Sequence, residues 1–342
     1  MMASTSLTGQ VSALPVGTHV IVAAFLGAVP VLALSDGTVL LFADKGPLPE
    51  TLGGARRLVA HLDATILLGA SDGRILVTGG DDGRIVAVAP DGGAQTIANE
   101  KGKWIDALAL RSDGAIAWSA GKEVRARDPK GEVKNFVAPS SVRGLAFMPK
   151  GYRLAVAHYG GVSLWFPNLA AVPDRLDWAG SHLDVTVSPD GRFAVSSMQE
   201  NALHGWRIAD KKSMRMTGYP TKSRSLSWSG NGDWLATSGA EACVIWPFQS
   251  KDGPMGKGPR ECGVRPSRVS CVAFHPQSLI VAIGYDDGFI MLCRLSDDGE
   301  IPVRSTTPGE SAAITALAWS ADGRRLLFGT EDGVAGLLDL PG

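Results

Sequence analysis

One pattern recurs along most of this chain: an apolar segment, a turn of the SPDG type, a segment of small residues, a second turn and a third apolar segment. Internal repetition at a fixed spacing constrains a fold more than any other sequence feature. Five copies are clear and three, nearest the N-terminus, are weaker. The repeats are 20–44, 64–90, 104–128, 141–167, 181–208, 222–248, 267–295 and 312–340.

The pattern of the repeated unit predicts β-strands. Apolar and polar residues alternate with a period of two, and Gly-Asp turns separate the segments, which is typical of hairpins rather than helices. Landmark residues at the end of the third segment follow one another at about 38–47 residues, the length of one four-stranded propeller blade. They are Phe42, Val88, Arg127, Trp165, Trp206, Trp246, Cys293 and Leu338.

These landmarks predict an all-β fold, a single propeller of eight blades, with seven as the alternative. The last repeat ends at its third strand, so a fourth strand has to come from elsewhere. Gln10 to Val16, which precedes the first repeat, is the candidate. Pairing it with the last repeat would remove an exposed sheet edge and make one domain of residues 1–342.

Three segments carry a resemblance to a known family. SPDGRFAVSS (188–197), SADGRRLLFGTEDG (320–333) and LAVAHYGGVSLW (154–165) resemble the WD40-repeat β-propeller family, and the resemblance covers nearly the whole chain. The family's Trp-Asp dipeptide is absent, however, and of its Gly-His pair only His61 and His182 fall near the expected place. The resemblance therefore implies the propeller fold, with the family's buried Asp-His-Ser-Trp network largely unmade.

Composition narrows the class of partner. The formal net charge is −1, which predicts no overall field toward nucleic acid or an anionic membrane. The apolar run from Val20 to Leu34 is too short for a membrane-spanning helix and no Lys or Arg precedes it, so it is interpreted as two buried strands. We therefore expect a cytoplasmic protein with neither nucleic acid nor membrane as its partner.

The sequence shows no catalytic set, and we do not expect an enzyme. GASDG (69–73) matches the GxSxG pattern of esterases but falls at the SPDG turn position between two strands, whereas the esterase motif requires a strand, a turn and a helix. The four cysteines have no CxxC spacing, which argues against a disulfide framework and against a zinc ribbon. Arg260 and Arg265 flank Cys262 and could lower its thiol pKa, but no base or second cysteine adjoins it in the sequence.

Histidines near one rim of the ring offer a metal hypothesis. His182 lies at the start of a first strand, His158 at the end of a second strand and His204 within a third, in neighbouring repeats. Imidazoles brought together there could hold zinc or a similar ion. The alternative is that they hydrogen-bond their neighbours within the fold, since side chains alternate between the two faces of a strand. No other cofactor is expected.

The stronger functional signal is the presence of large polar, charged and aromatic residues at turn positions where small residues would suffice. In the third to sixth repeats, the turns between second and third strands and the starts of first strands carry aromatic, charged and amide side chains. A basic run, Ala209 to Arg224, adjoins them, and Gln249 to Pro266 is the longest break between repeats. The candidate partner-binding residues are Trp104, Asp106, Arg143, Tyr159, Trp178, Met198, Gln199, Glu200, Asn201, Tyr219, Lys222 and Arg224.

The sequence therefore predicts a non-catalytic scaffold that binds a protein partner through the top face of the propeller, and the basic run favours an acidic partner. The alternative is a metal-handling or small-ligand-binding propeller that uses the histidines at the mouth of its central channel.

Overall fold

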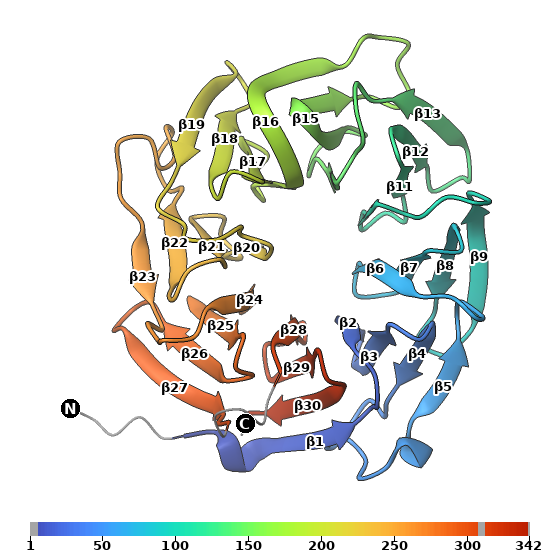
Figure 1. Ribbon diagram of the computed structural model, residues 1–342, viewed down its shortest axis with the longest axis vertical. Coiled ribbons are helices and arrows are strands. Elements are labelled where there is room, and N and C mark those ends of the chain that lie inside the picture. Colours follow the sequence, from blue (N-terminus) through green and yellow to red (C-terminus); the bar gives the residue numbers. More distant parts are fainter. Residues whose placement is uncertain (1–5, 307–311, 341–342) are drawn as a thin grey trace.

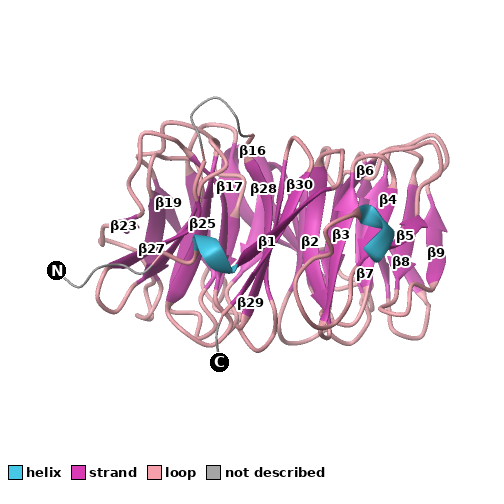
Figure 2. Ribbon diagram, turned by 90° about the horizontal axis from the view of Figure 1, so that it is seen from below, coloured by secondary structure: helices cyan, strands magenta, loops and turns pink. Residues whose placement is uncertain are grey.

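The computed structural model describes residues 6–306 and 312–340, and these form a closed ring of β-sheets around a central channel (Figure 1). Seen from the side, the ring is a disc with loops on both faces (Figure 2). The only helices in the described part of the chain are two short 3-10 turns, η1 (Thr8–Gln10) and η2 (Leu52–Gly54). None of its helices has the length and apolar character that crossing a membrane would require.

Each repeat, taken together with the connection that follows it, supplies strands in the order inner to outer. The first three repeats contain β2 (Val20–Leu26), β3 (Val29–Leu34), β4 (Thr38–Leu41) and β5 (Arg56–Val59); β6 (Ile66–Ser71), β7 (Leu76–Gly80), β8 (Arg84–Val88) and β9 (Ala94–Asn99); and β10 (Ala107–Leu110), β11 (Ile116–Ala120), β12 (Glu123–Arg127) and β13 (Val133–Val137). The apolar run from Val20 to Leu34 thus forms β2 and β3, as predicted, because both strands are buried between neighbouring sheets.

The middle of the chain departs from this regularity. The fourth and fifth repeats contain β14 (Gly144–Phe147), β15 (Leu154–Trp165), β16 (Asp174–Val187), β17 (Phe193–Met198), β18 (Leu203–Arg207) and β19 (Lys212–Met216). These six strands form one continuous sheet, because the two halves of the long strand β16 pair with different neighbours. Its first half pairs with β15 and its second half with β17.

The last three repeats are regular again. They contain β20 (Leu226–Trp228), β21 (Trp234–Thr237), β22 (Cys243–Pro247) and β23 (Arg260–Cys262); β24 (Val269–Phe274), β25 (Ile280–Tyr285), β26 (Ile290–Arg294) and β27 (Gly299–Arg304); and β28 (Ile314–Trp319), β29 (Arg325–Thr330) and β30 (Val334–Asp339). Counted as hydrogen-bonded sheets, the described part of the ring has seven members, six of four strands and one of six. The eight repeats are all present, and the shared strand β16 joins two of them.

The predicted closure is confirmed. Strand β1 (Val11–Pro15) pairs antiparallel with β30, from Val11 opposite Leu338 to Pro15 opposite Val334. Leu14 is 1% exposed and belongs to the hydrophobic cluster of the first and last repeats. The N-terminal segment therefore completes the last sheet and joins the two ends of the ring.

Strand direction fixes which residues share a face. Successive strands of a blade are antiparallel, so the turn between the second and third strands lies at the same end as the connection from the outer strand to the next repeat. We call this end the top face. The turns between first and second strands, and between third and fourth strands, lie on the opposite face.

Candidate functional site

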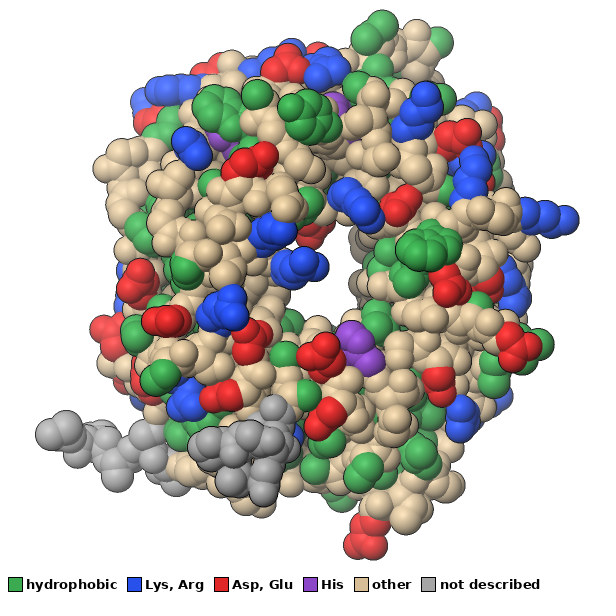
Figure 3. All heavy atoms as spheres, viewed as in Figure 1, with side chains coloured by type: hydrophobic (Ala, Val, Ile, Leu, Met, Phe, Trp, Pro, Cys, Tyr) green, Lys and Arg blue, Asp and Glu red, His purple; other side chains and the backbone are tan. Residues whose placement is uncertain are grey.

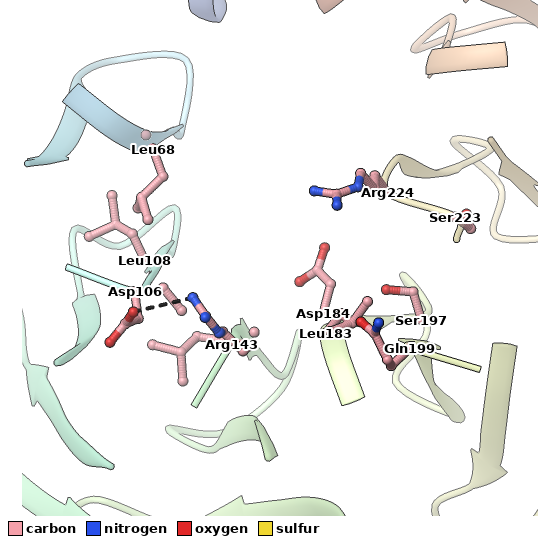
Figure 4. A pocket seen from close by; sticks show the side chains of 14 residues that line it. Leu68, Asp106, Leu108, Arg143, Leu183, Asp184, Ser197, Gln199, Ser223 and Arg224 are labelled. Carbon is pink, nitrogen blue, oxygen red and sulfur yellow. Dashed lines mark hydrogen bonds and ion pairs between the residues drawn. The ribbon is translucent and has the colours of Figure 1, made fainter. Parts of the chain in front are cut away.

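The top face opens into the central channel through a cavity of about 640 Å³. Residues of five successive repeats line it, including Leu68, Leu108, Asp184, Gln199 and Ser223, together with two arginines described next. In Figure 4 the labelled side chains approach one another from separate first strands and turns. We call this region the channel mouth.

Arginines from different repeats project over the channel mouth. Arg143 lies 3.4 Å from Asp106, while the side chain of Arg143 is 60% exposed. Arg224 extends toward the open channel from the sixth repeat, and Asp184 points into the same space (Figure 4). Burial raises the pKa of Asp184 to about 6, although the backbone N–H of Val185 donates a hydrogen bond to its carboxylate at 2.8 Å. The cavity therefore presents both signs of charge.

The basic side chains continue beside the cavity. A second hollow of about 460 Å³ is lined by Lys222, Arg224 and Arg268. Arg268 lies 3.6 Å from Asp286, but no ion pair forms for Lys222 or Arg224 within residues 6–306 and 312–340. Figure 3 shows Lys and Arg side chains gathered along one side of the channel opening. This basic arc is a local feature of a chain whose formal net charge is only −1.

Exposed aromatic rings lie on the same top face. Trp104 and Tyr159 are each 65% exposed, and Trp178 is 36% exposed. Trp104 precedes the first strand of the third repeat, Tyr159 lies within the long strand β15 of the fourth repeat, and Trp178 lies in the first half of β16. Trp178 stacks on His204 with ring centroids 3.9 Å apart, so one face of its indole is covered and the ring is held in place. Exposed aromatic side chains held rigidly are typical anchors for a protein partner.

Comparison with known proteins agrees with this architecture. The family model of the anaphase-promoting complex subunit 4 WD40 domain matches residues 272–341. The crystal structure of the C-terminal WD40 domain of Sif2 superposes with a TM-score of 0.75 at 13% identity, covering 95% of this chain and 97% of that one. The computationally designed Ika8 protein gives the same TM-score of 0.75 at 18% identity, covering 96% and 99%. The chain therefore has the β-propeller fold of the Sif2 WD40 domain.

Two curated relatives extend the comparison. Small ribosomal subunit protein RACK1 of Medicago sativa is 27% identical over 150 residues, 44% of this chain and 36% of the relative. Protein ROOT INITIATION DEFECTIVE 3 of Arabidopsis thaliana is 25% identical over 233 residues, 62% of this chain and 51% of the relative. This propeller therefore matches only about a third to a half of the length of these relatives.

Several predicted residues do lie together in the propeller. Asp106, Arg143, Gln199 and Arg224 line the channel mouth, and Lys222 lies beside it. Glu200 and Asn201 belong to the adjoining turn and are partly occupied by the fold. The Glu200 carboxylate accepts a hydrogen bond from the Ser181 N–H at 3.4 Å, and the Asn201 amide donates to the Pro220 carbonyl at 3.1 Å.

Met198 and Tyr219 are corrections to the predicted surface. Met198 is 2% exposed and Tyr219 is 7% exposed, so neither is available to a partner. The Tyr219 hydroxyl lies 2.6 Å from Thr237 Oγ1 and accepts a hydrogen bond from the Trp246 indole at 2.7 Å. Tyr219 is therefore buried because its hydroxyl joins two strands of the sixth repeat.

Parts of the family's polar network are formed in the two repeats that contain His61 and His182. In the second repeat His61 Nε2 lies 2.9 Å from Thr78 Oγ1, and His61 Nδ1 lies 3.0 Å from Asp82. In the fifth repeat His182 Nδ1 lies 2.7 Å from Ser196 Oγ. Buried polar groups need partners, and these repeats supply them without the Trp-Asp dipeptide.

The proposed metal ligands do not form a metal site. His158 Nε2 lies 2.8 Å from Ser163 Oγ, and His182 is occupied by Ser196 and by the Trp178 carbonyl at 3.0 Å. His204 lies between the rings of Trp178 and Trp206. Among the described residues no group of three His, Cys, Asp or Glu side chains is arranged to hold a metal ion. The histidines pack within the fold instead, and their contacts do not support the predicted metal site at His158, His182 and His204.

His204 predicts a pH dependence of stability. Both of its ring nitrogens are buried without a hydrogen-bond partner in the described part of the chain, and burial lowers its pKa to about 4. A histidine in the unfolded chain titrates near pH ~6.5. Between that pH and the lower pKa of the folded state, His204 is protonated in the unfolded state but not in the folded state. We expect about 3 kcal/mol of stability to be lost as the pH falls from ~6.5 to ~4.

Urea denaturation at several pH values measures this loss. Burial also lowers the pKa of His158 and His182, which adds to the same trend. His204→Phe keeps the ring stack and should make the dependence shallower, while His19→Gln at the half-buried start of the first repeat serves as a control. An equally steep dependence in His204→Phe would contradict the assignment to His204.

Sequence reasoning missed three charged residues at this site, Asp184, Arg268 and Asp286. Arg268 had a readable signal, because it precedes Phe274 by the same six residues that separate Lys222 from Trp228. Aligning the repeats on these aromatic residues would have placed it on the top face. Asp184 is a carboxylate within the second half of β16, where the first strands of the other repeats carry no charged residue, and this is also an irregularity of the repeat.

Proposed function

We propose that this propeller is a non-catalytic cytoplasmic scaffold that binds an acidic segment of a protein partner across the channel mouth. The observation that carries the proposal is the combination, on one face, of exposed aromatic rings and a basic arc in which Lys222 and Arg224 form no ion pair within residues 6–306 and 312–340. The basic arc supplies Arg143, Lys222, Arg224 and Arg268. Opposite charge would steer such a segment to the mouth and favour it over neutral competitors.

Apolar anchoring supports a protein partner in particular. Trp104, Tyr159 and Trp178 are exposed on the top face, and none of them lines either of the two hollows. Aromatic rings and arginines dominate the binding energy of protein interfaces. The basic side chains occupy one arc rather than a continuous track, which favours an acidic peptide segment over the sustained phosphate backbone of nucleic acid.

A charge reversal at the centre of the arc tests the proposal. Arg224→Glu, alone and with Trp178→Ala, is expected to weaken partner binding at least about tenfold, which corresponds to ~1.4 kcal/mol. Partners are compared by quantitative mass spectrometry after pull-down with each variant. Peptides selected on the wild-type protein from a random library should be rich in Asp and Glu, and their affinity should fall as salt is added.

The matched control is Lys130→Glu with Leu169→Ala. Both residues are exposed, and both lie in connections between third and fourth strands on the opposite face. This variant removes the same kind of charge and apolar area without touching the top face. Retention of all partners and peptides by Arg224→Glu/Trp178→Ala, with the wild-type melting temperature, would overturn the proposal.

The cavity itself favours a second candidate function, the binding of a small anionic ligand in the channel mouth. Its volume of about 640 Å³ lies within the range of small-molecule sites, and Arg143 and Arg224 both line it. A thermal-shift screen with small carboxylates and phosphates separates the two candidates. A ligand-induced rise in melting temperature that is lost in Arg224→Gln, with no selected peptide binding, would favour the small ligand.

A further inference from the structure

Three of the four cysteines meet at the junction of the sixth and seventh repeats. Cys243 is in β22, Cys262 in the outer strand β23 and Cys293 in β26 of the next repeat. Cys243 and Cys293 belong to one buried apolar cluster, and Cys262 packs against it. All three are free thiols.

The fold places one pair in disulfide register. Cys243 and Cys262 are directly opposite each other on adjacent antiparallel strands. Cα atoms of such opposed residues are about 4.5–5.5 Å apart, within the ~4.4–6.8 Å that a disulfide spans. A bond between them therefore requires no rearrangement of the backbone pairing.

The three thiols differ in access to solvent. Cys243 and Cys293 are fully buried, whereas Cys262 is half-buried on the outermost strand of its sheet. This position is at the outer rim of the ring, away from the channel mouth, so the proposed partner site makes no use of it. A small oxidant can therefore reach Cys262 more readily than either of its neighbours.

The surroundings also favour the thiolate form of Cys262. Hydrogen bonds from the Cys243 and Cys293 thiols lower the pKa of Cys262, and the nearby positive charge of Arg260 acts in the same direction. Burial raises the pKa of Cys243, so that residue stays a thiol that can donate. The fourth cysteine, Cys271, lies outside the cluster, and burial raises its pKa to about 11. Thiolate character combined with access is what makes a cysteine reactive.

We propose that Cys262 is a site of reversible oxidation by hydroperoxides, with Cys243 as the cysteine that resolves the oxidised form. The Cys262 thiolate sulfur attacks one oxygen of the peroxide. An S–O bond forms and the O–O bond breaks. The departing oxygen takes a proton and leaves as an alcohol or water. Cys243 sulfur then attacks the Cys262 sulfenic acid. An S–S bond forms, the S–O bond breaks, and hydroxide leaves with the Cys243 proton as water.

The first measurement is oxidation of the reduced full-length protein with hydrogen peroxide. Intact mass should fall by two hydrogens, and peptide mapping without reductant should find a Cys243–Cys262 link that dithiothreitol reverses. Before oxidation, iodoacetamide at neutral pH should label Cys262 at least about tenfold faster than Cys271, because the thiolate is the reacting species.

Three variants distinguish the roles. Cys262→Ser should abolish the loss of two hydrogens, and Cys271→Ser should leave it unchanged. Cys243→Ser should halt the reaction at the Cys262 sulfenic acid, which dimedone traps at that residue. Primary oxidation at Cys271, or a disulfide that still forms in Cys262→Ser, would overturn the proposal; so would a Cys262–Cys293 link in the wild type in place of the Cys243 link.

Discussion

Deletion of residues 1–15 is expected to leave a chain that does not accumulate as a folded monomer. The deletion removes β1, so β30 loses all five paired residues of its outer neighbour. It also removes Ser12, whose hydroxyl accepts a hydrogen bond from the Leu48 N–H at 2.9 Å in the first repeat. The ring would then carry an exposed sheet edge, which favours association with other chains.

A point substitution gives a graded version of this result. Leu14→Ala leaves the strand pairing intact but empties a site that is 1% exposed in the closing cluster. We expect it to cost about 2–4 kcal/mol of unfolding free energy, the usual effect of truncating a buried leucine. Gly9→Ala is the control, because an added Cβ at Gly9 meets no atom within 4 Å.

Size-exclusion chromatography and thermal denaturation measure both effects. The deletion should shift the protein into aggregates or the insoluble fraction, Leu14→Ala should melt several degrees lower, and Gly9→Ala should behave as wild type. A deletion variant that elutes as a monomer with the wild-type melting temperature would show that β1 is dispensable for closure.

Replacement of Arg325, which is 9% exposed, by methionine is expected to destabilise the protein by about 2–3 kcal/mol, because two charge-assisted hydrogen bonds from its guanidinium to backbone carbonyls would be lost. Arg325 begins β29 in the last repeat, yet its guanidinium donates to the carbonyls of Asp44 at 3.0 Å and Ala28 at 2.6 Å in the first repeat. The same group lies over the Phe25 ring, 5.1 Å from its centroid. Arg325 is therefore a second connection between the two ends of the ring.

Its neighbour provides the control. Arg324 is exposed, and only its backbone is engaged: its N–H donates to Asp322 at 3.0 Å and its carbonyl accepts from the Leu340 N–H at 2.8 Å. Arg324→Met should therefore leave urea denaturation unchanged, while Arg325→Met should lower the midpoint with little change in slope. Equal midpoints for the two variants would contradict the role given to Arg325.

Local pattern predicted the repeated features well. The alternation of apolar residues and the SPDG-type turns located every repeat, and the missing fourth strand of the last repeat pointed to the closing segment before the first. These features are local because hairpin geometry depends on residues within a few positions of one another. Similarly, GASDG proved to be a turn, since the Ser71 hydroxyl accepts from the Gly73 N–H and donates to the Ile75 carbonyl.

Whether a residue that breaks the repeat pattern is exposed or buried was less predictable, because the same residue type occurs in both environments. Tyr219 and Tyr159 both appeared to be surface chemistry, but the Tyr219 hydroxyl found a buried partner in Thr237 and Tyr159 did not. The turn expected at 158–161 lies within the single long strand β15, whose pairing with β16 is irregular between Tyr159 and Gly161. Such outcomes depend on what the neighbouring repeat presents.

The sequence by itself determined the repeating strands, the order of the sheets and the way in which the chain ends meet, because each follows from short-range periodicity and turn chemistry. Only the tertiary structure decided which side chains converge. Cys262 has no cysteine beside it in the chain, yet sheet register and the approach of the next repeat place Cys243 and Cys293 around it. Packing of successive repeats in the ring brings such distant residues into contact, and their spacing along the chain does not predict that contact.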